Sequence, residues 1–267
     1  MDWQRDIEVL TPLFNRGAYQ DTPELRVPSI RGMVRWWFRA LGGSADEEKE
    51  AFGGMKKFGQ RLAKEVTASR LVFRVKEVQA SPSPSKVPTL PHKQGGQASP
   101  QAAFLSDAQF QLQVFSRFGP LPGTLKSKVE NALEAWLLLG ALGLRANRSG
   151  GNVWPSKDAP ATPAELRKQL DSVGCRWPVY LTGPEIGSSV ELLRAAATDT
   201  VEGTPWVFGM ARGREREASP LKFKIVRLED RLRLLVTAKD ERTILEAKRL
   251  LVGHRSRPET WVKVEAN

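Results

Sequence analysis

Three arginines, Arg31, Arg35 and Arg39, recur at every fourth position of one segment. Because a helix has about 3.6 residues per turn, this spacing stacks the three side chains in one row along a helix. Residues 30–41 contain no Asp or Glu that could neutralise the row. Guanidinium groups bind phosphates through paired hydrogen bonds, so the row predicts a partner that carries several phosphates. A solvated helix face is the alternative interpretation.

The residues just before this row extend the candidate anion site. Arg26 adds a fourth guanidinium. Ser29 is the predicted N-cap of the helix, because a serine precedes the first apolar residue of the periodic segment. Its hydroxyl and the free N–H groups of the first turn could also bind a phosphate.

A second candidate is a loop rich in glycine and arginine at residues 140–151. Glycine lets a backbone adopt positive φ angles and pass close to a ligand, and two arginines supply positive charge. The loop is neither a P-loop nor a dinucleotide fingerprint, since it lacks a Gly-Lys-Ser/Thr ending and follows a helix. A tight helix-to-strand connection is the alternative interpretation. Its candidate binding residues are Gly143, Arg145, Arg148, Gly150 and Gly151.

Residues for catalysis are sparse. A single cysteine and two histidines exclude a disulfide framework, a Cys-based zinc site and a histidine-rich metal site. Asp21 lies in the sequence Asp-Thr-Pro, which is ordinary turn chemistry. The sequence therefore predicts no catalytic residue, no metal and no cofactor.

Composition restricts the class of protein. The chain has 267 residues and a net charge of +11, with 40% hydrophobic residues, enough to form a core. Its longest apolar run, residues 135–144, is too short for a membrane span of about 20 residues, and the N-terminus lacks a signal peptide. We expect a soluble, cytoplasmic protein with no membrane partner. The excess of Lys and Arg calls for a polyanion or an acidic protein as partner.

Hydrophobic periodicity predicts how these residues are positioned. The first half is expected to contain strands and helices at 5–10, 30–41, 46–52, 70–78, 108–118, 124–139 and 152–154. Apart from the short helix at 46–52, this order is the βαββαβ order of a ferredoxin-like fold. The second half repeats it, with elements at 177–181, 188–197, 221–227, 232–237, 240–252 and 261–264.

The predicted fold class is therefore α+β, with two ferredoxin-like (RRM-like) lobes and antiparallel sheets. The expected domains are residues 1–155 and 156–267, with the junction in the segment 155–163, which is rich in proline and alanine. Residues 81–101 hold five prolines and no acidic residue. Such a composition cannot form a core, so a flexible insertion is predicted there.

The segments Pro23-Glu24-Leu25-Arg26, 28–32 (PSIRG) and 35–42 (RWWFRALG) resemble the start of RAMP-superfamily subunits of type III CRISPR effector complexes. Within that superfamily the chain is most similar to the first subunit of the Cmr complex. The segments 50–54 (EAFGG) and 218–221 (ASPL), and the glycine-rich loop, fit the same family.

This resemblance implies a non-catalytic RNA-binding subunit at one end of a filament of RAMP subunits. Its expected partners are CRISPR RNA, target RNA and other RAMP subunits, and its contacts are with the phosphate backbone. The residues implied to bind RNA are Arg26, Ser29, Arg31, Arg35, Arg39, Gly143, Arg145, Arg148, Gly150 and Gly151. Two alternatives stay open: an endoribonuclease of the same superfamily that uses Asp21, and a basic scaffold that docks an acidic protein.

Overall fold

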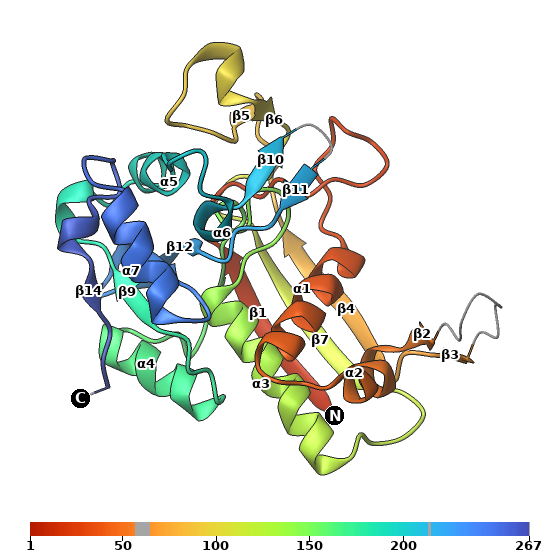
Figure 1. Cartoon of the computed structure of the whole chain (residues 1–267). Coiled ribbons are helices and arrows are strands. Elements are labelled where there is room, and N and C mark those ends of the chain that lie inside the picture. Colours follow the sequence, from red (N-terminus) through yellow and green to blue (C-terminus); the bar gives the residue numbers. More distant parts are fainter. Residues whose placement is uncertain (57–64, 213–214, 267) are drawn as a thin grey trace.

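The computed structural model describes residues 1–56, 65–212 and 215–266, and its first lobe is built on a four-stranded antiparallel sheet (Figure 1). The strand order is β4-β7-β1-β8. The elements of this lobe are β1 (Asp2–Val9), α1 (Val27–Ala40), α2 (Ala45–Phe52), β4 (Leu71–Gln79), β7 (Gln109–Ser116), α3 (Gly123–Leu139) and β8 (Val153–Pro155). The first and third of the four strands thus lie in the centre, as a ferredoxin-like order requires.

The second lobe has the same strand order, β12-β13-β9-β14, and is again antiparallel. Its elements are α4 (Pro163–Ser172), β9 (Val179–Leu181), α5 (Val190–Thr198), β12 (Lys222–Leu228), β13 (Arg231–Thr237), α7 (Glu241–Leu250) and β14 (Val262–Lys263). Glu229 and Asp230 turn the β12–β13 hairpin with positive φ angles, as the sequence predicts. The predicted α+β class with antiparallel sheets is confirmed.

Shorter elements lie within each half of the chain and outside the two four-stranded sheets. They are β2 (Gly54–Lys56), β3 (Glu65–Thr67), β5 (Val87–Pro88), β6 (Pro100–Gln101), α6 (Pro205–Phe208), β10 (Met210–Arg212) and β11 (Glu215–Glu217), with 3-10 turns at Gly95–Ala98, Pro184–Ile186 and Pro258–Thr260. Sequence periodicity missed α4, in which Thr162 accepts a hydrogen bond from the Glu165 N–H. The domain division at residues 155 and 156 stays a prediction.

Helices α1 and α3 cover one face of the first sheet (Figure 1). The apolar face of α1 buries Ile30, Val34, Trp37 and Phe38, as its spacing predicts. The other face of the sheet is polar, since Gln111 donates to Asp6 and Gln113 donates to Gln4 across the strands. The candidate basic residues therefore belong to the helical layer and its loops.

Residues 81–101 leave the first lobe and reach α5 of the second. Arg194 donates to the Pro88 carbonyl at 2.7 Å, and His92 Nδ1 lies 2.9 Å from Thr198 Oγ1. The segment that carries β5 and β6 otherwise projects from the body of the molecule (Figure 1). Composition did not predict these contacts. The flexibility of the insertion stays a prediction.

Candidate nucleic-acid interface

The arginine row of α1 packs against α2. Arg35 donates to Glu48 Oε1 from Nε at 2.8 Å and from Nη2 at 2.6 Å. Arg39 Nη1 donates to the same oxygen at 2.6 Å, and Glu48 is buried. Arg31 donates to the Phe52 carbonyl at the end of α2. The acid that pairs with the row therefore comes from the next helix, which the search for acids within residues 30–41 could not reveal.

Glu48 neutralises only part of this row. Three guanidiniums face one carboxylate, so positive charge remains. The side chains of Arg35 and Arg39 are 36% and 50% exposed, and their outer edges are open to a ligand. Burial lowers the pKa of Arg31, and the charge of Arg35 lowers it further. Arg31 thus contributes to α1–α2 packing more than to an open surface.

The start of α1 differs from the predicted cap. The N-cap residue is Arg26, and no side chain caps the helix there. Ser29 lies inside the first turn, where Pro28 also sits, and donates to Asn15 Oδ1 at 3.2 Å. Arg26 Nη1 donates to the Arg16 carbonyl. Ser29 is therefore held by the 14–16 segment, and the prediction that it caps α1 is wrong.

The 14–16 segment also contacts the glycine-rich loop. The Leu144 N–H donates to the Phe14 carbonyl at 2.9 Å. A Cβ on Gly143, whose φ is +85°, would lie 2.6 Å from that carbonyl oxygen. Residues 14 and 15 thus contact both the loop and the first turn of α1, and they bring the two predicted segments together.

The other glycines of the loop serve its own folding. A Cβ on Gly150 would lie 2.5 Å from the Leu144 carbonyl, and one on Gly151 would lie 2.1 Å from the Leu142 carbonyl. These distances are shorter than real Cβ contacts allow. These glycines therefore let the loop pass close to its own backbone. They affect a ligand by setting the position of Arg145.

Arg148 is enclosed between the two lobes and is only 8% exposed. Its guanidinium donates to the carbonyls of Phe208 at 2.8 Å and Leu221 at 3.2 Å, and to Ser219 Oγ at 3.1 Å. It also lies 5.4 Å from the centre of the Phe223 ring. Burial lowers the pKa of Arg148 to about 9. Its donors are directed at the protein and are already bound there.

Arg145 is exposed and belongs to a basic cluster that the sequence did not predict. Burial is the largest cause that lowers the pKa of His92, and the Asp199 carboxylate opposes it. Three cations lower that pKa further: Lys93, Arg255 and Arg145. These three residues, here called the basic cluster, lie far apart in the sequence. No spacing pattern could have linked them.

Two buried lysines of β12 contact tryptophans of the first lobe. Lys222 Nζ donates to Asn147 Oδ1 at 2.7 Å and lies 4.2 Å from the centre of the Trp36 ring. Burial lowers the pKa of Lys222 to about 8, and the charge of Arg148 contributes. Lys224 donates to the Leu137 carbonyl and lies near Trp154, and burial lowers its pKa strongly.

We expect the free energy of unfolding to rise with pH between about pH 8 and pH 10. Unfolded Lys222 keeps its proton up to its ordinary pKa of 10.5, whereas the folded side chain loses it from about pH 8. In this window the unfolded state binds more protons, so stability increases with pH. Urea unfolding at about pH 7, 8 and 9.5 measures the slope. Lys222→Met should reduce it and leave the part that Lys224 contributes, whereas an unchanged slope would contradict the prediction.

Asp21 lies beside a lysine. It is exposed, and its Oδ1 lies 3.2 Å from Lys86 Nζ. Within residues 1–56, 65–212 and 215–266, no three His, Cys, Asp or Glu side chains gather in a way that could hold a metal ion. In the same described ranges, none of the helices has the length and apolar character needed to cross a membrane.

Comparisons with known proteins agree on one family. The model of the RAMP superfamily matches residues 6–154. The CRISPR system Cmr subunit Cmr1-2 of Pyrococcus furiosus is 55% identical over 38 residues, which are 14% of this chain and 20% of that subunit. The matched segment thus spans about a fifth of this curated relative.

Solved structures share the fold. The crystal structure of apo Cmr1 from Pyrococcus furiosus aligns with a TM-score of 0.62 at 19% identity, over 89% of this chain and 87% of that one. A chain of the type III-B Cmr-beta complex, bound to cognate target RNA and AMPPnP in the presence of ssDNA, aligns with a TM-score of 0.50 at 11% identity. That alignment covers 88% of this chain and 93% of the other.

Proposed function

Because the chain belongs to the RAMP superfamily, we propose that it is a non-catalytic, RNA-binding subunit of a Cmr-like type III CRISPR effector complex. In this role it contacts CRISPR RNA, or its duplex with target RNA, through the phosphate backbone. It packs against other RAMP subunits at one end of their filament. The observation that carries the RNA-binding role is the basic cluster beside the glycine-rich loop, in a chain of net charge +11.

The proposed contacts fall into two groups. Lys93, Arg145 and Arg255 form the first group: all three are exposed and lower the pKa of His92 from three separate segments, and Arg255 Nε also lies 3.7 Å from Asp199 Oδ2. Arg35 and Arg39 form the second, with the outer edges of guanidiniums whose inner edges bind Glu48. Arg26 precedes both groups in the sequence and donates to the Arg16 carbonyl, two residues from Phe14, whose carbonyl accepts from the glycine-rich loop. Ser29, Gly143, Gly150 and Gly151 position these groups.

The proposal assigns no cleavage to Asp21. Metal-assisted cleavage of RNA generally needs more than one ligand for its metal ion. Asp21 instead has Lys86 as its neighbour. Incubation of the protein with target RNA and Mg²⁺ tests this assignment, and cleavage that is lost in Asp21→Ala would contradict it.

We expect the triple replacement Lys93→Gln, Arg145→Gln and Arg255→Gln to weaken binding of single-stranded RNA of any sequence. Each lost phosphate contact lowers the slope of log K against log[salt] by about 0.7, so the slope should fall by about 2. Fluorescence anisotropy at several salt concentrations measures both quantities. The melting temperature should change little, because all three side chains are exposed or half-exposed.

Two further variants sharpen this experiment. Arg249→Gln removes one exposed cation from α7 and is the control for the loss of a single charge outside the basic cluster, so its RNA affinity should stay close to that of the wild type. Glu48→Gln removes the carboxylate that competes for Arg35 and Arg39, and it should tighten RNA binding. If the triple variant and Glu48→Gln both bind RNA as the wild type does, the basic residues serve an acidic protein partner instead.

A further inference from the structure

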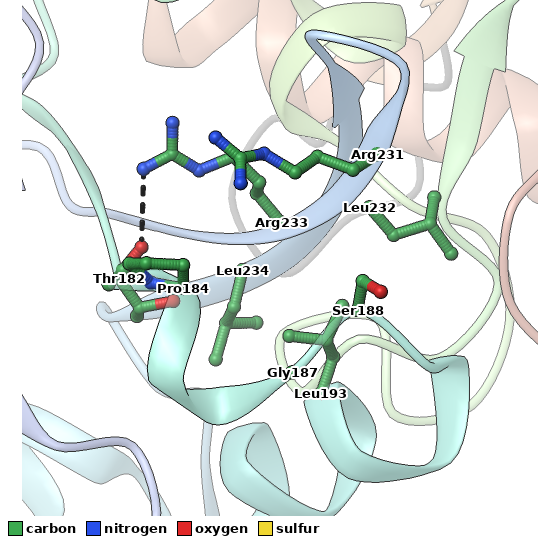
Figure 2. Close-up of a pocket in the computed structure, with 10 residues that line it drawn as sticks. Thr182, Pro184, Gly187, Ser188, Leu193, Arg231, Leu232, Arg233 and Leu234 are labelled. Atoms are coloured by element: carbon green, nitrogen blue, oxygen red, sulfur yellow. Dashed lines mark hydrogen bonds between the residues drawn. The ribbon is translucent and has the colours of Figure 1, made fainter.

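A small pocket opens in the second lobe, and none of the basic-cluster residues lines it (Figure 2). It lies between the start of β13 and the segment that connects β9 to α5, and its volume is about 130 Å³. Leu193 and Leu234 line it on the apolar side, and Arg231 and Arg233 line it on the polar side. Pockets that enclose a whole small molecule measure roughly 300–1,000 Å³, so this one fits a single chemical group.

The two arginines of this pocket extend in the same direction. They are two residues apart on β13 and therefore lie on one face of the strand. Figure 2 shows their guanidiniums side by side, with Arg233 directed at the Thr182 carbonyl. Two adjacent guanidiniums repel each other, and their placement favours a shared anion between or above them.

The protein itself satisfies these groups poorly. Arg233 is only 18% exposed at its side chain, yet its hydrogen bonds to the Thr182 carbonyl and to Glu229 Oε2 both measure 3.4 Å. Arg231 Nη2 lies 3.3 Å from the same Glu229 oxygen. Charge-assisted hydrogen bonds are normally about 2.7–2.9 Å long. One carboxylate at long distance leaves both net positive charge and unused donors.

We propose that this pocket binds one phosphate group through the guanidiniums of Arg231 and Arg233. Forked guanidiniums match the oxygen geometry of a phosphate, and Ser188 adds a hydroxyl at the rim. The pocket size admits the phosphate but no attached base. The phosphate comes either from an RNA strand or from a free small molecule. This inference stands apart from the proposed RNA contacts, because it uses none of their residues.

Thermal unfolding with inorganic phosphate, against sodium chloride at equal ionic strength, tests the pocket. Saturating phosphate should raise the melting temperature of the wild type by about 2 °C or more. The double variant Arg231→Gln, Arg233→Gln should lose this rise. Arg227→Gln should keep it, since Arg227 lies on the same hairpin but pairs with Glu8. No rise in the wild type would overturn the proposal.

A variant that keeps both arginines complements this test. Glu229→Gln removes the carboxylate that competes with phosphate for the two arginines. The phosphate concentration that gives half of the rise in melting temperature should therefore fall several-fold. An unchanged concentration would mean that the arginines only stabilise the hairpin, which would also overturn the proposal.

RNA oligonucleotides with and without a terminal phosphate identify the source. If the double variant binds only the phosphorylated oligonucleotide more weakly than the wild type does, the pocket holds an RNA end. If it binds both oligonucleotides more weakly, the pocket holds the RNA backbone. If the double variant and the wild type bind both oligonucleotides equally well, and the wild type responds to inorganic phosphate, the pocket holds a free phosphate compound. The triple variant of the basic cluster should keep the phosphate response, so failure of one proposal does not imply failure of the other.

Discussion

Trp37→Ala is expected to lower the free energy of unfolding by about 3–5 kcal/mol. The Trp37 ring is fully buried and lies 5.1 Å from the ring of Trp36 and 5.0 Å from that of Trp177, centre to centre. Trp177 precedes β9, so the ring joins α1 to the second lobe. Its removal leaves a cavity that the surrounding rings cannot fill, and chemical denaturation measures the loss.

Trp206 is the matched control for this prediction. It lies on α6 and is 48% exposed. Trp206→Ala should change the free energy of unfolding by about 1 kcal/mol or less, because exposed side chains contribute little to the core. A similar, small loss for both tryptophans would show that the Trp36–Trp37–Trp177 contacts are not part of the stable core.

Arg148→Ala should cost about 3 kcal/mol or more, and the loss should appear in stability instead of RNA affinity. The variant leaves the Phe208 and Leu221 carbonyls without their donor in a buried region. Each unsatisfied buried polar group costs about 1–3 kcal/mol. Urea unfolding and RNA anisotropy on the same preparation separate the two effects.

Arg145→Gln is the control from the same loop, three residues away. Its exposed side chain predicts the opposite result, an unchanged free energy of unfolding with weaker RNA binding. If instead Arg148→Ala unfolds like the wild type and binds RNA weakly, then Arg148 is an RNA ligand, as its sequence context indicates.

Local patterns in the sequence predicted the elements well, because periodicity depends on neighbours a few residues apart. The apolar face of α1 and the β12–β13 hairpin follow from spacing and turn residues. The resemblance of residues 23–54 and 140–151 to RAMP subunits is also confirmed, since the family model matches residues 6–154. The contribution of each basic residue depends instead on tertiary packing.

Three basic side chains show how tertiary packing decides what each one contributes. Arg35 and Arg148 look alike in sequence, each an arginine among few acids. Docking of α2 places Glu48 against Arg35, and docking of β12 surrounds Arg148 with carbonyls. No sequence pattern indicated a role for Arg255, because its neighbours in the basic cluster come from other segments. A pattern confined to one segment cannot report such pairings.

The contacts between the lobes have a consequence for cooperativity. One hydrophobic cluster runs from Trp37 in α1 to Phe223 in β12, and Arg148 bridges the same boundary with hydrogen bonds. Neither sheet can then lose its structure without exposing part of the other, so we expect the chain to unfold in one transition. A ligand held by either lobe stabilises both, since the free energy of binding enters a single folding equilibrium. RNA on the basic cluster and a phosphate on Arg231 and Arg233 would therefore protect the same molecule additively, even without any contact between their sites.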